Sequence, residues 1–366
     1  MRAEDPHPWI RKGYFMSKII CYTKKQKRIM QHDTGVGVVG AGAGTGKTQT
    51  LIGTITTLLN KYVGVKILVF NHSHDASRAF KVRLQHGLGY AADAVHVVTI
   101  HAFGFALIRK FYKELGFTRI PKVFKAVKNK LSARVKLKRN IIDYDDMITM
   151  PLQLFEKYPT ILEAVTNRFT DFMVDELQDV DKKQAMLIEL LAAKMVGVLL
   201  VGDPKQAIYG YRNAGVKHWD RLVKNLAPKH FVLTQTQRIP DASLAFVNSF
   251  AASFSDDLPL ISDVVGYKPE LYRFENPDAQ ANFIAITIEE LIKAGVDPSE
   301  IACLGRFNIP LLHLKVALEA RGIMTVQRNY SKILEKWSKA LGALICMVKW
   351  ISNQQLPTNI IVHCAE

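Results

Sequence analysis

The sequence has few cysteines, no apolar run of membrane-spanning length and fewer acidic than basic residues. Its 366 residues include four cysteines and no C-x-x-C pair, which argues against a disulfide framework and a cysteine-ligated zinc site. The longest apolar run, at residues 340–351, is interrupted by Lys349 and predicts a buried helix. We therefore expect a reducing, cytoplasmic location, without secretion or contact with a membrane.

The chain is strongly basic. It carries 49 Lys and Arg against 33 Asp and Glu, a formal net charge of +16. Such an excess favours a polyanionic partner, most simply nucleic acid. The alternative is a basic surface kept for solubility. A hydrophobic fraction of 48% is enough for folded cores, and the length suits about two or three domains.

A glycine-rich stretch follows the apolar residues 36–39. Glycines let the backbone turn tightly, so that several N–H groups point at one phosphate site at a helix N-terminus. Lys47 would add a positive charge for the β- and γ-phosphates, and the Thr48 hydroxyl would bind Mg²⁺. The first position of the pattern G-x-x-x-x-G-K-S/T is alanine here. The predicted phosphate loop is Ala41, Gly42, Ala43, Gly44, Thr45, Gly46, Lys47 and Thr48.

Two further apolar segments end in polar residues. Residues 172–174 lead into Asp175, which can hold Mg²⁺, and Glu176, which can deprotonate the attacking water. The alternative is that Asp175 and Glu176 are only the solvated end of a strand. The phosphate loop upstream in the sequence makes this alternative less favoured. Residues 198–203 lead to Gln206, which can contact the γ-phosphate, and to a Tyr-Gly-Tyr-Arg stretch able to stack on bases.

Apolar strands alternate with segments of helical periodicity. Strands are expected at residues 66–71, 95–99, 172–175 and 198–203, and this alternation predicts an α/β fold with a parallel sheet and ligands at the strand carboxyl ends. Residues 105–140 hold twelve Lys or Arg and one Glu. We divide the chain into a disordered leader (1–16), an ATP-binding domain (17–104 and 168–230), a basic helical insertion (105–167) and a second α/β unit (231–366) with strands at 231–233, 270–273 and 301–304.

The order of the motifs resembles the UvrD/Rep family of superfamily 1 DNA helicases, with its F-box-helicase-like branch the most similar. Residues 41–48 match the family's variant phosphate loop, including its alanine. Residues 175–179 match D-E-x-Q-D, and residues 202–214 match G-D-x-x-Q-x-I-Y-x-W/F/Y-R-x-A. Shorter matches lie at residues 99–103 (T-x-H-S/A-F/M), 143–147 (D-F/Y-D-D/N-M/L), 233–238 (L-x-Q-x-Y/F-R), Asn248 and 301–308.

The resemblance implies a P-loop NTPase with a RecA-like parallel sheet domain and a partial second RecA-like domain. It implies an ATP-dependent translocase or helicase that moves three-prime to five-prime on single-stranded DNA and DNA junctions, in bacterial or phage-infected cells. The cofactors would be ATP and Mg²⁺; a protein partner is left open. The implied ATP-site residues are Gln26 for adenine, Lys47, Glu176, Gln206 and an arginine finger at Arg238, with Thr48 and Asp175 for the metal. The implied DNA contacts are Phe70, Asn71, Thr99, His101, Phe103, Tyr209, Tyr211 and Arg212.

The sequence departs from the family pattern in two places. Gln237 stands where relatives have an aromatic ring against adenine, and the late motifs T-x-H-x-S/A-K-G-L-E and V-A/G-x-T-R-A/S are absent before Glu366. The chain could be a fragment, a protein completed by a partner, or a degenerate motor. A DNA-stimulated ATPase without unwinding and a non-catalytic DNA-binding module are therefore alternatives to a helicase. His72 and His74 are equally open as DNA contacts or surface histidines.

Overall fold

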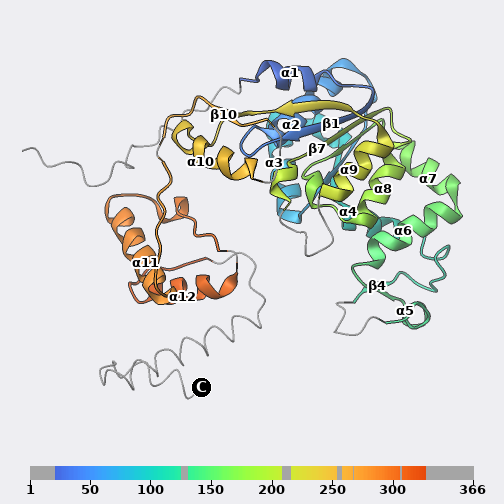
Figure 1. Ribbon diagram of the computed structural model, residues 1–366. Helices are drawn as coiled ribbons and strands as arrows, with labels where there is room; N and C mark the ends of the chain where they lie inside the picture. The colour runs from blue at the N-terminus through green and yellow to red at the C-terminus, as the bar shows by residue number, and fades with distance from the viewer. Residues whose placement is uncertain are drawn as a thin grey trace, which may run out of the picture. The chain divides into compact units, whose positions relative to one another are not determined.

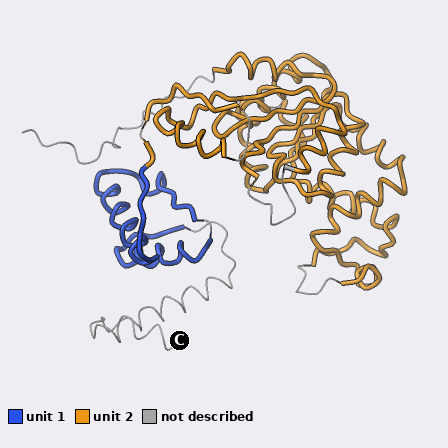
Figure 2. Tube along the Cα trace, viewed as in Figure 1, with its two compact units in different colours: residues 1–17, 270–366 blue, residues 18–269 orange. Residues whose placement is uncertain are grey.

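The computed structural model describes residues 21–124, 131–207, 216–253, 258–266, 268–305 and 307–326. Two compact units make up the chain, one of residues 18–269 and one of residues 1–17 and 270–366 (Figure 2). We call them the larger and the smaller unit. The expected leader, the apolar run at 340–351 and the predicted DNA contacts Tyr209, Tyr211 and Arg212 lie outside the described residues.

A six-stranded parallel sheet forms the centre of the larger unit, in the order β3-β2-β6-β7-β1-β8. Figure 1 labels its strands β1 and β7. Most strand residues are buried on both faces, which explains their continuous apolar runs. The α/β fold with a parallel sheet is confirmed. The strands are β1 (Gly35–Ala41), β2 (Ile67–Asn71), β3 (Val95–Thr99), β6 (Asp171–Val174), β7 (Gly197–Gly202) and β8 (Lys229–Leu233).

Helices cover both faces of this sheet. One core cluster joins the strands to helices before β3, through Ile29, Leu51 and Phe80. The other joins them to later helices, through Phe155 and Leu187. The first face has α1 (Lys24–Met30), α2 (Lys47–Lys61) and α3 (His74–Leu88); the second has α4 (Ile100–Lys110), α6 (Asp146–Lys157), α7 (Pro159–Thr166), α8 (Lys182–Ala192) and α9 (Val216–Leu226).

The segment predicted as a basic insertion includes α5 (Ala133–Arg139) and the short parallel pair β4 (Lys122–Val123) and β5 (Ile141–Ile142) (Figure 1). Its later helices α6 and α7 belong to the core on one face of the sheet. Lys136 Nζ lies 2.6 Å from Asp143 Oδ2 and 2.7 Å from Asp146 Oδ2.

Gly104 on α4 packs so closely on α6 that a Cβ there would overlap the Met147 carbonyl oxygen. This glycine therefore sets the approach of the two helices.

Strand β8 belongs to the first sheet, because it pairs with β1 in the register Val39–Phe231. The expectation that residues 231–233 open the second α/β unit is therefore wrong. A strand this short carries no local signal for the sheet it joins. The larger unit continues through β9 (Gln235–Thr236), α10 (Asp241–Ala252) and β10 (Ile261–Ser262).

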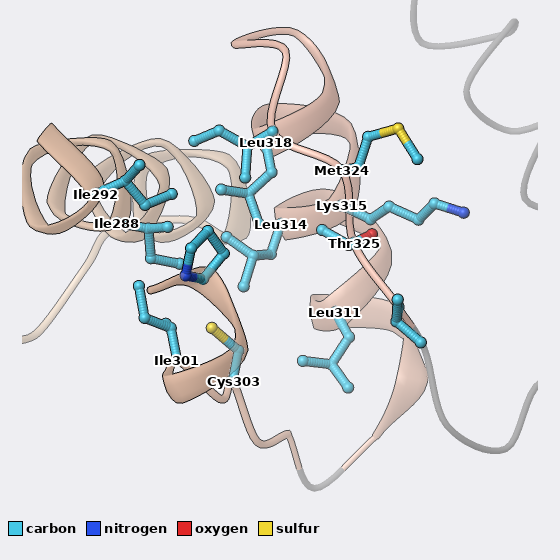
Figure 3. Close-up of a pocket in the computed structure, with 13 residues that line it drawn as sticks. Ile288, Ile292, Ile301, Cys303, Leu311, Leu314, Lys315, Leu318, Met324 and Thr325 are labelled. Carbon is cyan, nitrogen blue, oxygen red and sulfur yellow. The ribbon is translucent and has the colours of Figure 1, made fainter. Parts of the chain in front are cut away.

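The smaller unit is built on α11 (Pro277–Lys293) and α12 (Asn308–Glu319), which share a core that includes Ala285 and Leu314. The prediction of strands at residues 270–273 and 301–304 is wrong. Neither segment forms a strand, because neither pairs with another strand among the described residues. An apolar pocket of about 180 Å³ lies beside the helices, with Ile288 and Cys303 in its lining (Figure 3). Burial raises the pKa of the Cys303 thiol.

Short 3-10 turns lie at Gly89–Ala94, Leu177–Asp179, Pro204–Gln206 and Pro298–Glu300. No helix in the described ranges has the length and apolar character needed to cross a membrane.

Candidate functional site

The glycine-rich loop connects the carboxyl end of β1 to the first residue of α2. Gly44 and Gly46 have φ values of 72° and 82°, in the left-handed region that glycine adopts at low cost. Lys47 opens α2, and its Nζ donates to the Ala41 carbonyl at 3.2 Å. The ammonium group therefore lies across the loop, where it can meet a phosphate together with the N–H groups of the helix N-terminus.

Thr48 and Asp175 meet although they are 127 residues apart. The Thr48 hydroxyl donates to Asp175 Oδ2 at 3.1 Å, and Asp175 is only 6% exposed. Burial, and then the neighbouring Glu176 carboxylate, raise the pKa of Asp175 to about 6. A buried carboxylate beside a hydroxyl offers the hard oxygen ligands that Mg²⁺ prefers, and Mg²⁺ commonly completes its shell with phosphate oxygens and water. The residues present therefore fit the metal that the sequence implied.

Glu176 follows directly in an unusual backbone conformation. Its φ and ψ are 56° and 49°, left-handed values that are uncommon for a residue with a side chain. Such conformations persist where the surroundings hold them, and they concentrate at functional sites. The Glu176 N–H donates to Asp175 Oδ1 at 3.1 Å, and the Glu176 carboxylate accepts from Gln178 Nε2 at 2.8 Å.

The loop after β7 lies next to the phosphate loop, because Gly202 pairs with Gly40 in the sheet. Asp203 is buried, and burial raises the pKa of its carboxyl. Its two oxygens accept from the Lys205 N–H at 3.1 Å and from Gln206 Nε2 at 2.5 Å. A cavity of about 310 Å³ has both loops in its lining. The structure thus brings Gln206 to the phosphate loop, with its amide held by Asp203.

Arg238 also lies at the phosphate loop, although its side chain is exposed. The backbone N–H of Gln237 donates to the Gly44 carbonyl at 2.9 Å. A Cβ on Gly44 would lie 2.6 Å from Arg238 Cβ and 2.5 Å from Thr236 Oγ1. The segment that carries Arg238 therefore packs directly on the glycine turn, within the larger unit.

Gln26 is buried against the same loop. Its Nε2 donates to the Thr45 carbonyl at 3.1 Å, and its Oε1 accepts from the Thr23 N–H at 2.8 Å in a capping box at the start of α1. Both ends of the amide are thus used within the protein. Its role towards adenine stays a prediction, whereas its packing on the loop at Gly46 is shown.

Two predicted DNA contacts are core residues, which corrects the prediction. Phe70 is 0% exposed and Phe103 is 6% exposed, and their ring centroids lie 5.1 Å apart. Thr99 is 5% exposed and caps α4 by accepting from the Ala102 N–H. Asn71 is 2% exposed, and its Nδ2 has no hydrogen-bond partner among the described residues. Aromatic and polar types alone did not reveal that these side chains face inward.

Among the predicted DNA contacts that the structure describes, His101 remains partly accessible, and burial lowers its pKa. Its ring centroid lies 4.8 Å from that of Tyr144, which is 58% exposed. Sequence reasoning noted Tyr144 only as part of the acidic motif at 143–147. A small cavity of about 40 Å³ is lined by His101, Asp175 and Glu176, so the exposed ring pair lies close to these two carboxylates.

The chain matches the family model described as the UvrD/REP helicase N-terminal domain, over residues 22–135 and 122–227. "ATP-dependent DNA helicase PcrA" of Bacillus subtilis (strain 168) is 26% identical over 392 residues, which cover 90% of this chain and 53% of the relative. The protein of the same description from Staphylococcus aureus (strain NCTC 8325 / PS 47) is 25% identical over 346 residues, with 78% and 47% covered.

The chain spans about half the length of these curated relatives. Among solved structures, the Pif1 helicase from Candida albicans aligns with a TM-score of 0.32 and 15% sequence identity, over 59% of this chain and 40% of that one.

Proposed function

The chain belongs to the UvrD/REP helicase family, and on this premise we propose that it hydrolyses ATP and uses the energy to move along single-stranded DNA. The observation that carries the proposal is the meeting of Thr48 with Asp175 at 3.1 Å, with Glu176 beside them. This contact supports a site in which a phosphate loop, a metal-binding carboxylate and a candidate base share one edge of the sheet, where parallel α/β proteins bind ligands. The PcrA relatives, described as ATP-dependent DNA helicases, support it.

Binding of the nucleotide would use the loop at residues 41–48. Its backbone N–H groups and Lys47 bind the phosphates, with the metal held by Thr48 and Asp175. Mg²⁺, when bound there, neutralises charge on the phosphate oxygens. Lys47 must leave the Ala41 carbonyl to reach the phosphates, a small movement for a flexible side chain.

Hydrolysis would use groups from three segments around the loop. Glu176 orients the attacking water and accepts its proton. Gln206 contacts the γ-phosphate after it releases Asp203, and Arg238 stabilises the charge that develops there. The exposed guanidinium on a segment that packs against Gly44 supports this last assignment.

DNA would bind near the His101–Tyr144 ring pair, because an exposed aromatic ring can stack on an unpaired base. The basic insertion at residues 105–167 would contact backbone phosphates, which gives salt-sensitive, sequence-independent affinity. Movement from three-prime to five-prime, action on DNA junctions and a nucleoid-associated cytoplasmic location are further parts of the proposal. They rest on the family resemblance.

The test measures ATP hydrolysis by the chain with and without single-stranded DNA. We expect DNA to stimulate turnover, and Glu176→Gln to lower it by about a hundredfold or more, whereas the exposed control Glu156→Gln keeps it. Absence of DNA stimulation in the wild-type chain contradicts the proposal. Retained turnover in Glu176→Gln removes Glu176 from the role of base.

Direction is tested separately. Streptavidin placed on the five-prime or the three-prime end of an oligonucleotide should be displaced from the five-prime end, if the protein moves three-prime to five-prime. Displacement from the three-prime end alone would reverse the assignment.

A further inference from the structure

Gln178 joins the candidate base Glu176 to the loop that carries Gln206. Its Nε2 donates to Glu176 Oε2 at 2.8 Å, and its Oε1 accepts from the backbone N–H of Asp203 at 2.9 Å. Gln178 is 3% exposed. One buried amide therefore bridges the carboxylate that follows β6 and the turn that follows β7.

The orientation of this amide follows from its partners. A backbone N–H can only donate, so the Gln178 atom that faces Asp203 must be the carbonyl oxygen. The NH₂ group is then the end that faces Glu176, and it requires an acceptor there. Glu176 Oε2 supplies this acceptor, so the hydrogen bond fixes the direction of the Glu176 side chain.

Gln178 packs closely against the end of β7. A Cβ on Gly202 would lie 2.6 Å from Gln178 Oε1 and 2.8 Å from Trp219 Cζ3. The Gln178 amide therefore packs directly on the end of β7. A displacement of the turn at residues 202–206 would act on Gln178 through the hydrogen bond from the Asp203 N–H.

We infer that Gln178 is a positioning residue, which transmits the state of the Gln206 loop to the Glu176 carboxylate. The inference rests on the proposed function and adds a mechanical link to it. When Gln206 leaves Asp203 for a γ-phosphate, the turn moves, and Gln178 aims the carboxylate of Glu176 at the attacking water. Without the link, ATP still binds, but the base is misaligned.

The distinguishing experiment is steady-state ATP hydrolysis by the full chain, saturated with single-stranded DNA. Gln178→Met removes both hydrogen bonds at similar volume. Gln178→Glu keeps an acceptor for the Asp203 N–H but replaces the donor that faces Glu176. Since a misplacement of about 1 Å can cost about a hundredfold in rate, we expect kcat to fall about 10- to 100-fold in both variants, with KM for ATP within about threefold.

The control is Gln85→Met, at an exposed position on α3. It should keep both kcat and KM. Affinity for a non-hydrolysable ATP analogue, measured directly, should be unchanged in all three variants. Thermal unfolding shows whether Gln178→Met has folded; Gln178→Glu carries the test if it has not.

If the wild-type chain hydrolyses ATP and both Gln178 variants keep a kcat within twofold of it, the inference is overturned. The proposed function is unaffected by that result. A parallel loss of analogue binding also overturns it, because a loss of binding indicates a structural role. A wild-type chain that hydrolyses no ATP overturns the proposed function and the inference together.

Discussion

Replacing Asp175 with asparagine should stabilise the protein when no divalent cation is present. The carboxyl is 6% exposed, and burial and the adjacent Glu176 raise its pKa from the ordinary 3.8 to about 6. The folded state therefore holds a proton at pH values where the unfolded state has released it. Because the folded state binds more protons between pH 3.8 and about 6, stability falls as the pH rises through this window.

The size of the effect follows from the same values. At about 1.4 kcal/mol for each pH unit between 3.8 and about 6, the ionised carboxylate costs the folded state about 3 kcal/mol at pH 8. Asparagine keeps an oxygen for the Glu176 N–H but offers an NH₂ group to Thr48, which changes one hydrogen bond worth about 1 kcal/mol. The expected net gain for Asp175→Asn is about 1–2 kcal/mol at pH 8.

The assay is urea unfolding of wild type and Asp175→Asn, at pH 4 and pH 8, in the presence of a chelator. The difference in unfolding free energy should favour the variant at pH 8 and vanish or reverse near pH 4, because most of the charge penalty is lost close to the ordinary pKa of 3.8. The other acidic groups are shared by the two proteins, so the difference isolates Asp175. Added Mg²⁺ with an ATP analogue should stabilise wild type more than the variant.

The exposed residue Asp93 provides the control, and Asp93→Asn should shift stability by less than about 0.5 kcal/mol at either pH. The reasoning is refuted if Asp175→Asn is less stable than wild type at pH 8 without cations. A gain that is the same at pH 4 and pH 8 would also refute it, because the gain would then have another origin than the carboxylate charge.

Three further changes follow from single contacts. Gly104→Ala should cost about 3 kcal/mol in urea unfolding, because its Cβ would overlap the Met147 carbonyl where α4 crosses α6. Lys136→Met should cost about 2 kcal/mol in the same assay, since it leaves Asp143 and a second carboxylate without their shared cation. Arg238→Ala should slow ATP turnover at least about a hundredfold and leave the affinity for an ATP analogue within about threefold.

Each of these has a matched control. Gly87→Ala places a Cβ where no heavy atom lies within 4 Å, so it should be neutral or slightly stabilising. Lys138→Met removes an exposed lysine on the same helix as Lys136 and should change stability by less than about 0.5 kcal/mol. Arg83→Ala, at an exposed position on α3, should keep ATP turnover. Equal effects in a variant and its control would contradict the assigned contact. If Arg238→Ala loses affinity for the ATP analogue, Arg238 is not an arginine finger.

Local signals predicted most of the larger unit. Residues 66–71 and 95–99 became β2 and β3 within a residue, and the glycine turn lies before α2 as expected. These signals depend on neighbours in the chain, namely apolar runs and glycine at positive φ. The pairing of β8 was missed, because the identity of a neighbouring strand is decided by contacts far away in sequence. For the same reason, residues 270–273 and 301–304 carried a strand signal without forming a ladder among the described residues.

Side-chain direction was the other point that the sequence could not decide. Phe70 and Phe103 have the residue type of a base-stacking site, yet helix and strand packing turns both rings into the core. Tyr144 is exposed beside His101, although nothing in its local pattern distinguished it from a core aromatic. Exposure is a property of the packed layers, so it appears only once the sheet and its helices are assembled.

By itself, the sequence determined the chemistry that one short segment can supply. The residues of the phosphate loop, and the type and spacing of Asp175 and Glu176, were sufficient to predict phosphate and Mg²⁺ binding, since backbone turns and strand ends are local. Tertiary structure decided which groups meet: Thr48 with Asp175 across 127 residues, and Gln178 with Asp203 across 25. Those pairings depend on the order of β6, β7 and β1 in the sheet, which brings distant strand ends to one edge and fixes each hydrogen bond there.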